Sequence, residues 1–133
     1  MAVSTTIYPT TVTWNSLTWN STTAGGPIRA EYTHRGTEVA DRTGDALYPL
    51  FLAIVDGVGQ ARVRLRDVKF TVALGTKSNL VFTLVGKATS VTVTLAGMVL
   101  VGVDPGEQGR AEQGTCTLIF AHESTDGTTV PVS

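Results

Sequence analysis

The sequence has little of what builds covalent frameworks or metal sites. Among its 133 residues are one cysteine, Cys116, and two histidines, His34 and His122. A single cysteine excludes a disulfide within the chain and, with it, the class of small disulfide-rich secreted domains. Two histidines and one cysteine offer no zinc-site spacing. We therefore expect no cofactor and no metal, in a chain long enough to fold without cross-links.

Charge is also scarce. Charged residues make up 16% of the chain, whereas about 25% is usual for a soluble domain. The formal net charge is -1, which excludes a basic nucleic-acid-binding footprint over the whole chain. Few charges on a foldable chain indicate that part of its surface is covered by another molecule, which is a mild sign of oligomerisation.

Long apolar runs and helical patterns are missing as well. The longest apolar stretch, residues 91–103, contains threonine and glycine and is shorter than the roughly 20 residues of a membrane helix. The first residues have no signal-peptide pattern, so we expect neither a signal peptide nor membrane insertion. The one helix candidate is residues 44–57, where Asp45 could cap a short helix but Pro49 would lie awkwardly inside it.

What is present is a period of two, which predicts an all-β domain over residues 1–133. From Val91 to Val103 every odd position is apolar or glycine, so the odd positions are expected to form one core face. The even positions begin polar and then become apolar at Ala96, Met98 and Leu100. This change predicts an outer face that enters a contact with a neighbouring subunit.

Other segments extend the predicted sheet. The run 61–74 changes phase at Arg66-Asp67, which predicts a bulge, and it is expected to form a hairpin with residues 78–85. Residues 56–60 are expected to be a hairpin turn, and residues 50–55 a buried strand. Long loops, which usually contact something, are predicted at 35–49 and 104–114.

Both tryptophans lie in residues 11–20, which read TVTWNSLTWN. Asn15-Ser16 is expected to form a two-residue turn with Trp14 and Leu17 on either side. A platform that stacks sugars or bases places several aromatics on one face, but only 7% of this chain is aromatic. Packing of Trp14 and Trp19 in the core or in an interface is therefore favoured.

The remaining polar residues favour structure over chemistry. His34 and His122 are expected to be exposed at strand ends, and the acidic loop 104–114 lacks the ligand order of an EF-hand. The strongest electrostatic feature is a stripe of alternating arginines, Arg62, Arg64 and Arg66. Such a stripe can contact phosphate. Pairing with acidic residues of a neighbouring strand or subunit is favoured, because Asp67 follows directly and the chain is slightly acidic.

Taken in order, several segments form a recognisable series. They are VTWNSLTWN, IRAEYTHRGTEVADRTGDALYP, the bulged strand with RDV, LGTKSNLVFTLV, VTVTLAGMVLVGVD and the closing GTCTLIFAHESTDGTTVPV. This series resembles the major tail tube protein of long-tailed, siphovirus-like bacteriophages. The resemblance spans most of the chain through patterns and not through invariant chemistry.

The resemblance implies a β-sandwich or partly closed β-barrel, usually with one short helix. It implies hexameric rings whose strands join into an inner barrel, stacked into a tube in the virion that DNA passes through non-specifically. The implied partners are further copies and the tape measure, terminator and distal tail proteins, with assembly in the host cytoplasm. Residues expected to bridge stacked rings are Arg35, Glu38, Asp41, Arg42 and Asp45. Residues expected between subunits are Ala96, Met98, Leu100, Trp14 and Trp19.

Two other classes stay open. One is a different virion β-protein, such as a capsid decoration, head-tail connector or tail terminator protein. The other is a carbohydrate-binding or adhesion module with Trp14, Trp19 and Tyr32 as its platform. An enzyme is the least favoured class, because no nucleophile and no general acid/base pair stands out.

Overall fold

The computed structural model of the chain describes residues 11–20, 26–41, 44–45, 47–66, 70–86, 88–110 and 114–133. These residues form an all-β fold without a helix, which confirms the predicted class. Where the candidate helix at residues 44–57 is described, it is replaced by turns, bends and the start of a strand. The strands are β1 (Thr11–Trp14), β2 (Leu17–Asn20), β3 (Pro27–Asp41), β4 (Phe51–Arg66), β5 (Lys77–Leu84), β6 (Val91–Glu107) and β7 (Thr115–His122).

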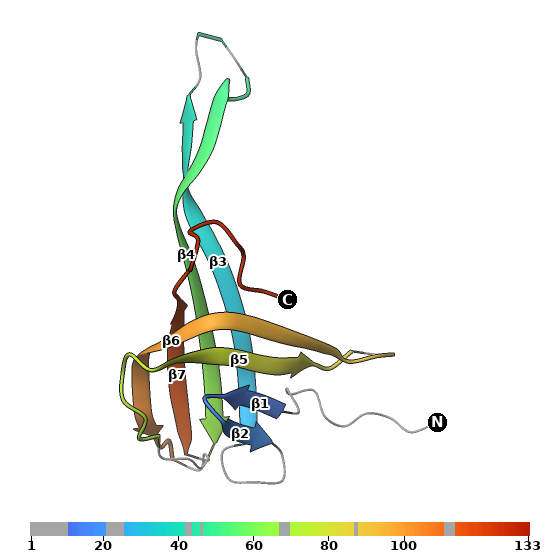
Figure 1. The fold of residues 1–133 in the computed structure, drawn as a ribbon, viewed down its shortest axis with the longest axis vertical. Helices are drawn as coiled ribbons and strands as arrows, with labels where there is room; N and C mark the ends of the chain where they lie inside the picture. Colours follow the sequence, from blue (N-terminus) through green and yellow to red (C-terminus); the bar gives the residue numbers. More distant parts are fainter. Residues whose placement is uncertain are drawn as a thin grey trace.

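All seven strands belong to one antiparallel sheet in the order β2-β1-β5-β6-β7-β4-β3. The sheet is not closed into a barrel. It folds over itself instead, so that β1, β2 and β5 cross β7, β4 and β3 in a sandwich-like arrangement (Figure 1). Strand β6 belongs to both halves, because it pairs with β5 through its first part and with β7 through its second.

The core lies between the two halves, and both tryptophans are part of it. Trp14 is fully buried, its ring centroid lies 5.0 Å from that of Phe120, and its Nε1 donates to the Met98 carbonyl (3.2 Å). Trp19 is 5% exposed. Core packing of the tryptophans is thus confirmed, and their assignment to a subunit contact is wrong.

The tight turn between β1 and β2 is also confirmed. Asn15 and Ser16 have φ angles of 51° and 63°, as a two-residue type I′ hairpin turn requires. Trp14 and Leu17 face each other across it. Local chemistry therefore sets this hairpin, because asparagine tolerates the left-handed region better than most residues do.

The alternation along β6 is broken at Gly97, which has a φ of 62°. A bulge there changes the phase of the strand, so that Met98 and Leu100 point into the core with 0% exposure. Their predicted outer position is wrong, and of that group only Ala96 is exposed. Val101, predicted to face the core, is 49% exposed.

Strand β4 differs from the sequence expectation in its partners. It pairs with β3 and β7 and not with β5, and residues 70–76 are not a strand. Residues 56–60 lie inside β4 and form no hairpin turn. Strand β4 ends at Arg66, and Asp67 lies outside the described residues. The bulge expected at Arg66-Asp67 therefore stays a prediction. The core-facing row of β4 meets that of β7 through pairs remote in sequence, Ala61–Phe120, Val63–Leu118 and Leu65–Cys116.

Strands β3 and β4 continue together beyond the sandwich as a two-stranded projection (Figure 1). We call this projection the arm, meaning residues 36–41 of β3, residues 51–58 of β4 and the turn between them. The predicted loop at 35–49 is therefore wrong up to Asp41. The predicted strand at 50–55 exists from Phe51, but it is not buried, since Leu52 is 57% and Ile54 65% exposed.

Candidate assembly surfaces

The arm is apolar on both of its faces. Residues directly opposite each other in an antiparallel pair point to the same side. One face of the arm therefore carries Val39, Ala53, Phe51 and Val55, and the other carries Ala40, Leu52 and Ile54. The exposures of Phe51 (56%) and Ile54 (65%), one on each face, show that neither face is covered by the described chain.

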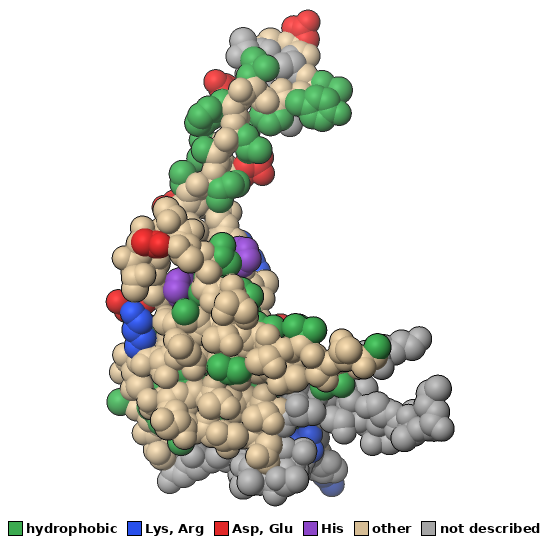
Figure 2. Space-filling view, turned by 45° about the vertical axis from the view of Figure 1, so that its right-hand side comes forward, with side chains coloured by type: hydrophobic (Ala, Val, Ile, Leu, Met, Phe, Trp, Pro, Cys, Tyr) green, Lys and Arg blue, Asp and Glu red, His purple; other side chains and the backbone are tan. Residues whose placement is uncertain are grey.

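The charge of the arm is acidic. Between residues 36 and 58 the sequence has four carboxylates, Glu38, Asp41, Asp45 and Asp56, and one arginine, Arg42. Glu38 and Asp41 lie on opposite faces of β3, and Asp45 lies in the turn at the tip. Figure 2 shows the arm as apolar side chains interrupted by acidic ones.

This placement settles where the predicted ring-bridging residues lie. Arg35, Glu38 and Asp41 are exposed strand residues at the base and along the arm, and Asp45 is exposed at its tip. Arg42 lies outside the described residues. The sequence placed these charges correctly at the surface and missed that a strand carries most of them.

A bulge at the base sets the arm off from the body. The register of β3 and β4 shifts between Arg35 and Thr37, and Asp56 has a φ of 54°. A Cβ on Gly36 would overlap the side chain of Ile54, so the close approach requires glycine. Beyond this point β7 no longer supports β4, because it pairs with residues 60–66 only. Within the described chain the arm is thus a lone pair of strands.

The second surface lies on the outer side of β4, where the predicted arginine stripe alternates with buried residues. Arg62 and Arg64 are exposed, whereas Ala61, Val63 and Leu65 are fully buried. Arg66 is half-buried at the end of the row. We call the outward row Arg62, Arg64 and Arg66, together with its neighbours Arg29 and Glu31 on β3, the arginine face.

Little in the described chain neutralises the arginine face. Glu31 lies opposite Arg62, but its carboxylate is paired with Arg29 at 2.9 Å. Arg64 donates to the Thr115 hydroxyl at 3.4 Å, which neutralises no charge. The favoured prediction, pairing of Arg62, Arg64 and Arg66 with acidic residues of a neighbouring strand or subunit, therefore remains a prediction.

An aliphatic strip runs beside the arginine face on β6 and β7. Ile119 is opposite Arg62 on the same side of the sheet and lies against Gly102, where an added Cβ would be 3.5 Å from its Cδ1. Ala121 and Val99 follow as an outward pair. The outer surface of the body thus combines guanidinium groups with an apolar strip.

The last residues extend the other half of the sandwich. Val132 bridges to Leu95, and Thr94 and Ser133 exchange two hydrogen bonds of 2.9 Å. The amide of Ala96 donates to the Pro131 carbonyl at 3.1 Å. The edge of β6 around Ala96 is therefore occupied by the chain itself, which argues against the predicted role of Ala96 between subunits.

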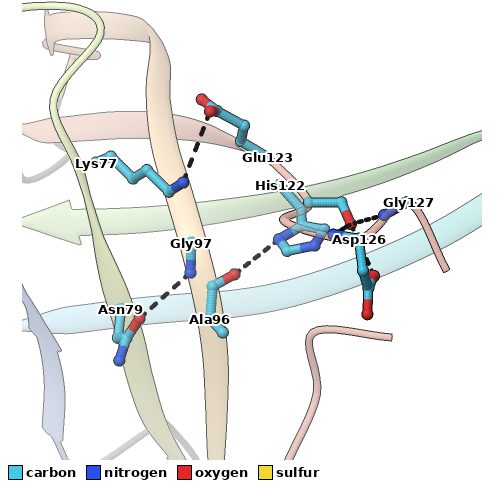
Figure 3. A network of polar contacts seen from close by, with 9 residues as sticks. Lys77, Asn79, Ala96, Gly97, His122, Glu123, Asp126 and Gly127 are labelled. Atoms are coloured by element: carbon cyan, nitrogen blue, oxygen red, sulfur yellow. Dashed lines mark hydrogen bonds and ion pairs between the residues drawn. The ribbon is translucent and has the colours of Figure 1, made fainter. Parts of the chain in front are cut away.

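A network of polar contacts holds this terminal segment near β5 and β6 (Figure 3). His122 Nδ1 donates to the Ala96 carbonyl at 2.7 Å, and Lys77 pairs with Glu123 at 3.7 Å. Asp126 accepts from the amides of Thr128 and Thr129, each at 2.9 Å. These bonds, with the hydroxyl of Thr129 foremost, lower the pKa of Asp126 well below its usual range.

His122 and the two tryptophans, which the sequence offers as candidates for chemistry or sugar binding, make structural contacts in the described chain. His122 is held by the Ala96 carbonyl, and no group of three or more metal-binding side chains converges. Trp14 and Trp19 are buried, so the proposed aromatic platform with Tyr32 is not formed. No helix in the described residues is long and apolar enough to cross a membrane.

A scan against protein-family models and a search of curated proteins found no match to this chain. The function proposed below therefore rests on the arm and the arginine face, together with the resemblance read from the sequence.

Proposed function

We propose that the chain is a structural virion protein that assembles with copies of itself into the stacked rings of a phage tail tube. The arm is the observation that carries this proposal. A two-stranded hairpin without further support is at best marginally stable in water. Exposed apolar surface of this kind marks an interaction site, and here it lies on both faces of the same pair of strands.

Unpaired strand edges support the same proposal. Strand β3 is the last strand of the sheet and runs for 15 residues. Long open edges invite pairing with other chains, and natural monomers usually protect them. A head-to-tail ring supplies each edge with a partner from the next copy and closes on itself, so that no edge is left over.

The resemblance supplies the finer terms of the proposal. It implies six subunits per ring, an inner barrel joined from neighbouring strands, and a lumen through which DNA slides without specific binding. The tape measure, terminator and distal tail proteins are the further partners it implies. An all-β sandwich-like body with a long projecting hairpin is compatible with each of these terms.

Self-assembly can be tested with the purified chain and one deletion. Size-exclusion chromatography with light scattering, beside negative-stain electron microscopy, should reveal rings or tubes as the concentration rises. A variant in which Asn-Gly replaces residues 36–57 would join the paired residues Arg35 and Val58 by a two-residue turn. It should stay monomeric, because it lacks the arm. Native tryptophan fluorescence from Trp14 and Trp19 would show that its body still folds.

Other outcomes would point elsewhere. A full-length chain that stays monomeric at every concentration would contradict the proposed function. Three-fold particles that bind capsids would identify a decoration protein instead. Rings that form equally well without the arm would show that assembly does not depend on the arm, and would remove the observation that carries the proposal.

A further inference from the structure

We propose that the arm of one copy docks on the arginine face of a second copy. This inference rests on the proposed function and names the two surfaces that would meet in the assembly. It commits to a second copy as the occupant, because the same chain carries both halves of a complementary pair. The first half is acidic and apolar, and the second is basic and apolar.

The charges of the two surfaces are complementary. The arm has four carboxylates against one arginine, and Glu38, Asp41 and Asp56 are exposed on its strands. On the arginine face, the flanking carboxylate Glu31 is already paired with Arg29. Docking of arm against arm would instead bring carboxylates together, which is costly when interfaces are desolvated.

The apolar parts of the two surfaces also match. Phe51 and Val55 line one face of the arm beside Asp41. On the body, Ile119 lies beside Arg62, and Val101 is 49% exposed on the neighbouring strand. The methylene stems of arginine add apolar surface between these aliphatic groups and the charged ends. Each surface is therefore an apolar strip with charges of one dominant sign along it.

The lengths of the two surfaces are compatible. Residues 36–41 of β3 extend the arm beyond its base, which at about 3.3 Å per residue is roughly 20 Å. The row from Arg62 to Arg66 lies within four residue steps of β4, or about 13 Å by the same measure. One arm is thus long enough to cover the whole row.

Phosphate is the other ligand that a row of arginines can bind, and the surroundings favour the arm. Glu31 flanks the row on β3, and Asp104 faces outward on β6 opposite Thr117. A nucleic-acid backbone carries negative charge continuously and would pass both carboxylates. The arm instead presents single carboxylates that are separated by apolar side chains.

Charge reversal with complementation tests the docking. We would make R62E/R64E on the arginine face and D41K on the arm face that carries Phe51 and Val55, and measure assembly by sedimentation velocity. Each variant alone should need at least about a tenfold higher concentration to assemble, because like charges then meet. An equimolar mixture should assemble again, since each acidic arm meets a basic face and each basic arm meets an acidic face.

Controls separate docking from folding and from general charge effects. Leu84→Glu adds a charge at a position of β5 that is 49% exposed and belongs to neither surface, and it should leave assembly unchanged. If R62E/R64E fails to fold, as judged by tryptophan fluorescence, R62Q/R64Q gives a milder loss of the same contact. Raising the salt concentration should weaken assembly of the unchanged chain, because exposed charge pairs are screened.

Each remaining outcome bears on one proposal. Folded variants that assemble normally, or a mixture that stays monomeric, would overturn the docking. The proposed function would still stand if the unchanged chain forms tubes. A wild-type chain that never assembles would overturn the proposed function itself. A further outcome is that R62E/R64E assembles normally but no longer binds a short DNA duplex that the unchanged chain binds. That result would overturn the docking and identify the arginine face as a phosphate-binding surface.

Discussion

At the scale of single residues, Trp14 is the largest fully buried side chain in the described residues. It is fully buried, stacks near Phe120 and donates a hydrogen bond to the Met98 carbonyl. Trp14→Ala should lower the free energy of unfolding by about 3–5 kcal/mol, as large-to-small changes of buried aromatics do. Urea unfolding followed by circular dichroism would measure this loss. Leu17→Ala, at a position that is 37% exposed, should cost less than about 1 kcal/mol, and equal losses would contradict this account.

Asp126 acts locally, on the segment that precedes the terminal bridge to β6. Its pKa is lowered by hydrogen bonds that its charged form accepts, so this contribution is present above the ordinary carboxyl pKa and is lost as the pH falls through the lowered one. The protection of the Thr128 and Thr129 amides from hydrogen exchange, relative to the intrinsic rate at the same pH, should therefore fall on strong acidification. Asp126→Asn should produce faster exchange already at neutral pH. Unchanged exchange in that variant would contradict the role of the carboxylate.

Residue-level expectations held where the determining interactions are local. The left-handed turn at Asn15-Ser16 depends on two adjacent residues, and it was predictable. We expected Trp14 and Trp19 to be buried because the chain has too few aromatic residues for an exposed stacking platform. Whether they were buried in this chain or in an interface was not predictable, because that depends on strands paired across the whole chain, such as β1 with β5.

At the scale of elements, β6 depends on one glycine. An added Cβ at Gly97 would lie 2.9 Å from the Glu123 carbonyl oxygen, and the φ of 62° disfavours any side chain. Gly97→Ala should cost about 1–3 kcal/mol of unfolding free energy, measured by denaturant titration. Gly106→Ala in the same strand, where an added Cβ meets nothing within 4 Å, is the matched control. Similar losses of unfolding free energy in both variants would contradict the requirement for glycine at the bulge.

The same bulge explains why the alternation of β6 misled the sequence interpretation. A period of two assigns faces correctly only while no residue is inserted. The predicted core face held at Val93, which packs against the core, and at Leu95, whereas Val91 is 56% exposed. Beyond Gly97 the inward residues were Met98 and Leu100. The glycine was visible in the sequence, but glycine in a strand does not by itself reveal whether a bulge is formed.

At the scale of the whole molecule, the arm is the part of the fold that the described chain leaves uncovered. The run LFLAIV, residues 50–55, has no polar residue, which is the pattern of a strand covered on both faces. From the sequence, we expected other residues of the same domain to bury this strand. The structure leaves the strand uncovered from Phe51, so the prediction that the chain itself buries it is wrong. In the proposed assembly, other copies would cover it.

A polar substitution on each face of the arm tests whether both are covered in the assembly. Ile54→Lys alters one face and Phe51→Lys the other, and both positions are already exposed in the single chain, at 65% and 56%. The body should therefore fold normally in each variant, while assembly followed by sedimentation velocity should be lost in both, because burying an unpaired charge is costly. Leu74→Lys, at a position that is 64% exposed away from the arm, should assemble like the unchanged chain. If only one arm variant lost assembly, the arm would lie on a single surface, and its second apolar face would remain without a role.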